Sequence, residues 1–190
     1  MWGQVGKGSK RTGGFSLVEV IIATVLVVVG LGGLTQSVGS SIQLSRVNAE
    51  RSAAEDAGQR MVGVLRSTDF EDIFATFNTS PLDDPAGAGS AVGESFDVDG
   101  LRAQSTDADG FAGQVIFPTE LAVGTGGLQL REDTVDSSLG MPRDLNGDSM
   151  IAFDNLDHSG DYIVLPIKLR IQWQGVAGDC SLEINLILTE

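Results

Sequence analysis

Residues 15–34, FSLVEVIIATVLVVVGLGGL, form an apolar run in which Glu19 is the single charged residue. As an α-helix this run would be about 30 Å long, which matches the hydrocarbon thickness of a bilayer. Its β-branched residues would also suit a buried strand, but a strand of this length would be anomalous. The run therefore predicts a membrane-length helix, and the rest of the chain is organised around it.

The charges on the two sides of the run are unequal. Lys7, Lys10 and Arg11 precede it, and no charged residue follows it until Arg46. The positive-inside bias therefore predicts a cytoplasmic N-terminus and an exported remainder. Two alternatives have a similar pattern: a Sec signal peptide, for which Val38-Gly39-Ser40 could be the cleavage site, and a plain single-pass anchor.

Composition narrows the classes of partner and site. The 190 residues carry a formal net charge of −14. After residue 78 there are 5 basic and 19 acidic residues. The region after residue 78, called the head below, is therefore strongly acidic and repels the phosphate backbone of nucleic acids. We expect no nucleic acid partner, and DNA uptake is disfavoured. The one cysteine, Cys180, excludes an intramolecular disulfide and a multi-cysteine zinc site, and we expect it to be buried.

Beyond the run the helix is predicted to continue to about Arg66, because no proline interrupts residues 15–80. Three opposite-charge pairs at a spacing of four, Arg46–Glu50, Arg51–Glu55 and Asp56–Arg60, support it. Glycines 30, 32 and 33 are expected to soften or locally melt it. The predicted apolar stripe of this stalk consists of Ile42, Ala49, Ala53, Ala57, Met61, Val64 and Leu65.

The C-terminal third gives the clearest strand signal. Apolar residues alternate with polar ones over residues 167–173 and 182–188, and the link 175–179 makes a hairpin. Aligning the apolar faces places Arg170 opposite Glu183 and makes Trp173 a core residue. Earlier in the head we expect a helix at Asp69–Phe77, an irregular loop at Ser80–Gly93, and strands at Ser95–Arg102, Gln114–Phe117 and Leu128–Arg131. The predicted fold class is α+β, with the long N-terminal helix packed on a small antiparallel sheet.

The start of the run also carries a specific motif. A basic leader ends in glycine, and Gly14-Phe15-Ser16-Leu17-Val18-Glu19 follows in one register. This stretch resembles the class III signal of type IV pilins and type II secretion pseudopilins. The resemblance covers about residues 1–60 and implies a pilin-like fold. The chain lacks the paired cysteines and the helix-kinking proline of many major pilins, so a minor pilin or minor pseudopilin is expected.

The resemblance also implies how the protein is processed and where it is assembled. A prepilin peptidase would cut after Gly14, and the new terminus at Phe15 would be N-methylated. The expected domains are a leader (1–14), a transmembrane and assembly helix (15–34), an amphipathic stalk with a short second helix (35–78), and an acidic β-rich extracytoplasmic head (79–190). The expected partners are the peptidase, other pilin or pseudopilin subunits, an inner-membrane assembly platform and membrane lipid. The protein would start as a single-pass inner-membrane precursor and end in a pilus or pseudopilus.

Glu19 needs a partner, because a carboxylate costs about 2.5–3.5 kcal/mol at a bilayer centre. Cleavage would create a cationic α-amino group at Phe15. Glu19 of one subunit can pair with the terminal amine of a neighbour, and the helix N-terminus favours an anion in its first turn. Glu19 is therefore the candidate assembly residue.

The head contains two further motifs that could carry chemistry. Asp144-Leu145-Asn146-Gly147-Asp148 resembles the start of a calcium loop, with Asp154 or Asp157 as a further candidate ligand, although Ser149 and Asn155 depart from the pattern. Calcium is thus a candidate cofactor. The alternative interpretation of this stretch is a solvated acidic turn that binds no metal. Asp157-His158-Ser159 cannot form a triad, because adjacent residues do not face one another, and we expect no enzymatic activity. The alternative function is a singly anchored extracytoplasmic protein that binds a ligand or calcium.

Overall fold

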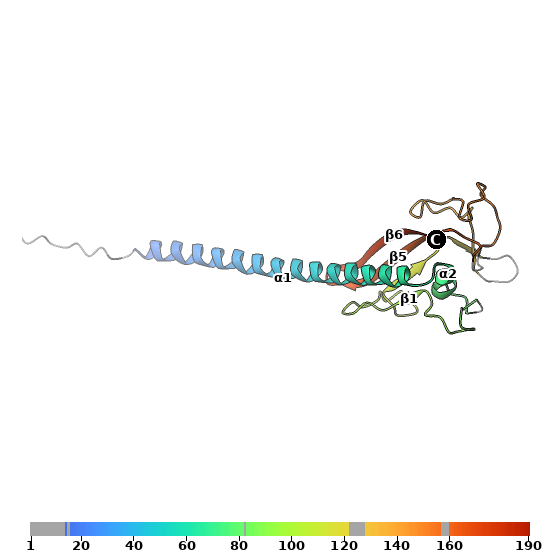
Figure 1. Ribbon diagram of the computed structural model, residues 1–190. Coiled ribbons are helices and arrows are strands. Elements are labelled where there is room, and N and C mark those ends of the chain that lie inside the picture. The colour runs from blue at the N-terminus through green and yellow to red at the C-terminus, as the bar shows by residue number, and fades with distance from the viewer. Residues whose placement is uncertain (1–13, 15, 82, 122–127, 157–159) are drawn as a thin grey trace, which may run out of the picture. The chain divides into compact units, whose positions relative to one another are not determined.

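The computed structural model describes residues 14, 16–81, 83–121, 128–156 and 160–190. It divides into two compact units, Met1–Ser45 and Arg46–Glu190. The long helix α1 (Leu17–Ser67) contributes residues to both units (Figure 1). The outer part of α1 therefore belongs with the β-rich head, and the two units are described separately below.

Helix α1 begins and ends close to the predicted limits. Its first turn is anchored at Ser16, whose carbonyl accepts the N–H groups of Glu19 (3.0 Å) and Val20 (3.2 Å). The predicted first residue, Phe15, lies outside the described residues. The expectation of local melting at glycines 30, 32 and 33 is wrong, since α1 runs through them without a break. Each glycine costs about 1 kcal/mol but keeps its backbone N–H, so the hydrogen-bond ladder continues.

The buried stripe of α1 differs from the predicted one. Ala57, Met61 and Leu65 are buried as expected, whereas Ile42 and Val64 are about half exposed. The actual stripe follows spacings of three and four along one face and consists of Ala54, Ala57, Gly58, Met61, Val62 and Leu65. Small residues occupy its first half, so the helix backbone lies close to the sheet there. Of the three predicted charge pairs, Arg51–Glu55 forms an ion pair at 2.8 Å.

The predicted second helix is present in two pieces. A 3₁₀ turn, η1 (Phe70–Asp72), leads directly into α2 (Ile73–Phe77). Ile73, Phe74 and Phe77 are buried, and Phe70 packs against the same core. The expected apolar face of this segment is confirmed.

The head contains one four-stranded and one two-stranded antiparallel sheet. The larger sheet has the order β1-β2-β5-β6 and the smaller pairs β3 with β4. The strands are β1 (Ser95–Phe96), β2 (Gly113–Ile116), β3 (Thr119–Leu121), β4 (Leu128–Leu130), β5 (Val164–Gly175) and β6 (Gly178–Thr189).

The minor strands match the predictions unevenly. β2 and β4 lie within one residue of the expected limits, and β3 was not predicted. The strand expected at Ser95–Arg102 ends at Phe96, because a turn follows at Asp99-Gly100, where Gly100 has φ +80°. Glycine tolerates this left-handed conformation, which ends the extended backbone.

The C-terminal hairpin has the predicted register. Arg170 pairs with Glu183 across β5 and β6, and its Nε lies 3.2 Å from Glu183 Oε1. The connection is shorter than expected, with Val176 and Ala177 between the strands. Trp173 is buried at 5% exposure, as predicted. Cys180, expected to be buried, is only partly buried at the rim of the core.

The outer part of α1 covers one face of the hairpin. A Cβ added to Gly58 would overlap Ile184 Cδ1 and lie 3.6 Å from Ile171 Cδ1, so helix and sheet are in close contact there. In Figure 1 the last turns of α1 lie beside β5 and β6. The coarse prediction, a long helix on an antiparallel sheet in an α+β fold, is confirmed.

Candidate functional site

Glu19 lies in the first turn of α1, on the apolar N-terminal stretch. Its side chain is exposed and, among the described residues, has no hydrogen-bond or ion-pair partner. Gly14 is exposed as well, with no atom within 4 Å of an added Cβ. Phe15, the predicted new terminus, is outside the described residues. Within the described part of the chain, an exposed glycine thus lies five residues before a carboxylate that has no partner.

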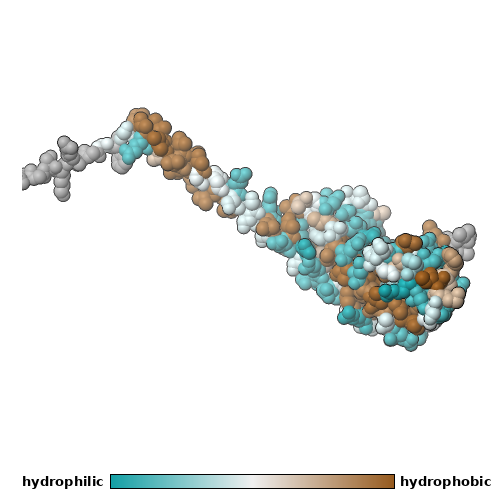
Figure 2. All heavy atoms as spheres, turned by 90° about the horizontal axis from the view of Figure 1, so that it is seen from above, coloured by the Kyte–Doolittle hydropathy of each residue, from teal (hydrophilic) through white to brown (hydrophobic). Residues whose placement is uncertain are grey.

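The described apolar side chains around Glu19 are exposed and form no hydrophobic core. α1 contains a segment long and apolar enough to cross a membrane, and none of that segment is buried within the protein. In Figure 2 this part of the helix is mostly brown, while the Arg46–Glu190 unit mixes teal and brown. Exposed apolar surface on this scale needs lipid or other helices around it. A single-pass anchor is compatible with this helix, and a signal sequence would meet the same criteria.

Ser16 and Glu19 also have the spacing of a capping box, in which serine and glutamate side chains hydrogen-bond the first backbone N–H groups of a helix. Ser16 immediately precedes the first residue of α1, and Glu19 is the third residue of the helix. Among the described residues neither side chain makes such a hydrogen bond, so a capping role for Glu19 rests on the spacing alone. A glutamine can also cap, whereas it cannot form an ion pair, so the two roles are separable by substitution.

The residues predicted to bind calcium lie in one loop, but their oxygens face the loop's own backbone. Asp144 Oδ1 and Oδ2 accept the N–H groups of Gly147 (2.6 Å) and Ser149 (2.7 Å). Asn146 Oδ1 accepts the N–H of Asp148 at 3.0 Å, and Asp148 Oδ1 accepts that of Met150 at 2.7 Å. Asp154 is exposed on the same loop.

These contacts describe a hydrogen-bonded turn. Over the residues that the structure describes, no group of three or more His, Cys, Asp or Glu side chains could hold a metal ion. Asp157 and His158 fall outside those residues. Calcium binding therefore stays a prediction, and the geometry adds no argument for it.

Glu132, which the sequence did not single out, organises this loop. Its side chain is buried at 1% exposure, and Oε1 accepts the N–H groups of Leu145 (2.7 Å) and Asn146 (3.2 Å). Oε2 accepts the N–H of Ala152 at 2.9 Å. A carboxylate that accepts three backbone N–H groups satisfies its own charge and fixes the loop around it. No local motif marks Glu132, because its partners are 13 to 20 residues away.

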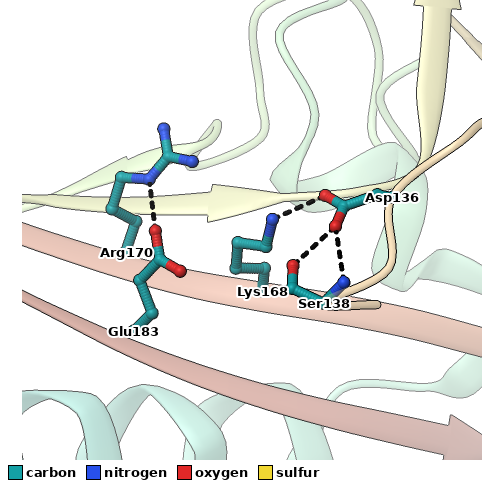
Figure 3. A network of polar contacts seen from close by, with 5 residues as sticks. All are labelled: Asp136, Ser138, Lys168, Arg170 and Glu183. Atoms are coloured by element: carbon teal, nitrogen blue, oxygen red, sulfur yellow. Dashed lines mark hydrogen bonds and ion pairs between the residues drawn. The ribbon is translucent and has the colours of Figure 1, made fainter. Parts of the chain in front are cut away.

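A second polar cluster lies on the face of the sheet away from α1. Lys168 on β5 is 6% exposed, and its Nζ lies 2.5 Å from Asp136 Oδ2 (Figure 3). Asp136 Oδ1 accepts the N–H (2.9 Å) and the hydroxyl (2.6 Å) of Ser138. The bonds from Lys168 and then Ser138 lower the pKa of Asp136 to about 2. This cluster fastens the 131–142 segment over the sheet.

Tyr162 joins the second helix to the sheet. Its hydroxyl donates to the carbonyls of Phe70 (3.2 Å) and Glu71 (3.1 Å) and accepts the N–H of Phe74 at 3.4 Å. Burial raises the pKa of Tyr162 to about 12. The hydroxyl is thus a structural hydrogen-bonding group, and it stays neutral at physiological pH.

Comparisons with models of known protein families, with curated proteins and with solved structures find no match. Function is therefore argued from the chain's own residues.

Proposed function

We propose that this protein is a structural subunit, a minor pilin or minor pseudopilin, of a type IV pilus or type II secretion pseudopilus. It is inserted as a single-pass precursor and cut by prepilin peptidase after Gly14. N-methylation at Phe15 and extraction into a filament follow. One observation carries the proposal: an exposed apolar helix whose single carboxylate, Glu19, has no partner among the described residues and lies five residues after an exposed glycine.

The apolar part of this helix is stable only where lipid or other helices cover it. Its apolar stretch buries nothing within the protein, so lipid covers it before assembly and neighbouring helices cover it afterwards. In the neighbouring-helix environment an isolated Glu19 is costly, while a Glu19 paired with an α-amino group is tolerable. The amine exists only after cleavage, so processing supplies the partner that sets the axial register between subunits.

The head is suited to a structural role. Its polar groups are used to hold loops, as in the Glu132 and Lys168–Asp136 clusters. The folded head is fastened to the outer part of α1, where the Glu50 carboxylate accepts the N–H of Val176 at the tip of the β5–β6 hairpin. A head held in this way moves together with the outer part of α1.

The proposal is tested by expressing the full chain with and without a prepilin peptidase. We expect a shorter product only when the peptidase is present, and no shortening when Gly14 is replaced by valine. Gly30→Val is the matched control, because it makes the same change on the helix where an added Cβ meets no other atom. Identical products with and without the peptidase would reject the proposal.

A further inference from the structure

Strand β6 is a long open edge of the larger sheet. It pairs with β5 over twelve consecutive residues, and the sheet order ends with it. Within the described part of the chain no backbone pairs with its other side. The opposite edge of the sheet, β1, has only two residues. The sheet therefore has one short edge and one edge of full length.

The direction of the free backbone groups follows from the ladder. Gln172 N–H donates to Ala112 O at 2.7 Å and Gln174 N–H donates to Arg102 O at 2.9 Å, so even-numbered residues of β5 face the β2 side. The odd-numbered ones face β6, where they pair with even-numbered residues. The residues of β6 whose N–H and C=O groups face the open side are therefore Ser181, Glu183, Asn185 and Ile187.

This edge lacks several of the features that usually prevent strand addition. Gly178–Thr189 contains no proline, lysine or arginine, and its register with β5 continues without a bulge. Long edges without such protection are templates for an additional strand. A strand added here would form a regular ladder with the four outward residues.

The β6 side chains on the face covered by α1 indicate which residue types an added strand would carry on that face. An apolar row of five residues is only partly buried, because the outer part of α1 lies over the sheet with Gly58 against Ile184. An added strand with apolar residues at alternate positions would extend this row and reduce its exposure. The row consists of Cys180, Leu182, Ile184, Leu186 and Leu188.

The other face of β6 indicates the charge of the added strand. Asp179 and Glu183 point to this face, four residues apart, and both are exposed, although Glu183 also forms an ion pair with Arg170 at 3.2 Å. Residues 46–190 as a whole hold nine basic and 25 acidic residues. An approaching strand with lysine or arginine at the same spacing would be attracted, and an acidic one repelled.

A second copy of the chain fits this edge less well. Pairing two β6 edges so that their apolar rows join is antiparallel, which would run the Arg46–Ser67 parts of α1 in opposite directions. Heads that stand in one filament with the same orientation, as the proposed function requires, have these parts of α1 running in the same direction. The two acidic heads would also repel one another.

We infer that the β6 edge binds an extended segment of another protein by strand addition, and that this segment alternates apolar residues with basic ones. The backbone of Ser181, Glu183, Asn185 and Ile187 supplies the hydrogen bonds. The apolar row and the acidic pair select the sequence. This surface goes beyond the proposed function, which concerns the N-terminal helix.

The test uses the full chain in detergent micelles and a synthetic peptide, TVKVTVKVT, whose lysines are four apart. We expect it to slow amide hydrogen exchange ~tenfold at the four outward residues, while the inward amides of β6 are already protected. The acidic peptide TVEVTVEVT should bind at least ~tenfold more weakly. Asn185→Pro should also weaken binding ~tenfold, since proline removes an outward N–H without breaking the β5–β6 ladder.

Asn185→Ala is the matched control, because it keeps the N–H and should bind as wild type does. Circular dichroism of the proline variant checks that the head is still folded. Equal binding of the two peptides, or unchanged binding by Asn185→Pro in a folded head, would overturn the inference. Protection of the outward amides that appears without peptide and rises with protein concentration would assign the edge to a second copy instead, and would also overturn it.

Discussion

The ammonium of Lys168 lies 2.5 Å from Oδ2 of Asp136, and the lysine side chain is only 7% exposed against 30% for the aspartate. The pair is therefore asymmetric: the cation is buried and the anion reaches solvent. Removing the anion leaves a buried uncompensated charge, whereas replacing the cation by an apolar side chain leaves a solvated carboxylate. The asymmetry predicts unequal effects on stability when one or the other partner is replaced.

Asp136→Ala should lower the free energy of unfolding by about 2–4 kcal/mol, because it strands the Lys168 charge. Lys168→Met should change it by less than about 1.5 kcal/mol, since methionine fills a similar volume without a charge. Urea unfolding of the full chain in micelles measures both variants. Equal losses for the two would show that the lysine is not buried as described.

The same pair predicts an acid dependence of stability. Asp136 has its pKa lowered from 3.8 to about 2, first by Lys168 and then by Ser138. A group with a depressed folded-state pKa stabilises the protein above its unfolded value, and the contribution is lost as pH falls from 3.8 to about 2. The loss should be on the order of 1 kcal/mol after solvent screening, and Lys168→Met should reduce it. A wild-type curve that is flat over this range, or one that Lys168→Met leaves unchanged, would contradict the assignment.

Glu132 should be essential to the 143–152 loop. Glu132→Gln places an NH₂ group among three backbone N–H donors, so we expect a loss of about 1–3 kcal/mol and faster proteolysis within the loop. Glu120→Gln makes the same change at an exposed position and should leave both unchanged. Proteolysis of the loop at the wild-type rate in Glu132→Gln would refute the role given to this carboxylate.

Two glycines of α1 form a matched pair for helix packing. Gly58→Leu should cost about 1–3 kcal/mol, because even the Cβ overlaps Ile184. Gly63→Leu, where an added Cβ meets nothing within 4 Å, should gain up to about 1 kcal/mol from helix propensity. Thermal unfolding measures both; stabilisation by Gly58→Leu would contradict the close contact of helix and sheet.

Two substitutions at Glu19 distinguish a capping role of this residue from a role in assembly. Glu19→Gln retains a capping side chain but removes the charge, and Glu19→Ala removes both. If the charge pairs with a neighbour's terminal amine, both variants should be cut normally and fail to enter filaments. The measurement is the filament fraction relative to the membrane fraction. Assembly of Glu19→Gln at the wild-type level would leave capping as the role of this residue.

The sequence predicted best where periodicity and register act over many residues. The apolar helix, the β5–β6 hairpin and the Arg170–Glu183 pair follow from alternation that one slipped residue would destroy. The stalk stripe was partly wrong, because small residues such as Ala54 and Gly58 are buried by close backbone approach and carry little hydropathic signal. The buried Glu132 and Lys168 could not be found, since their partners come from distant segments.

The most direct measurement of the central claim is mass spectrometry of the mature protein's N-terminus from cells that contain a prepilin peptidase. The account predicts that the chain begins at an N-methylated Phe15, which supplies the amine for Glu19. A chain that keeps the leader, or one that begins near Ser41 after signal-peptide cleavage, would contradict it.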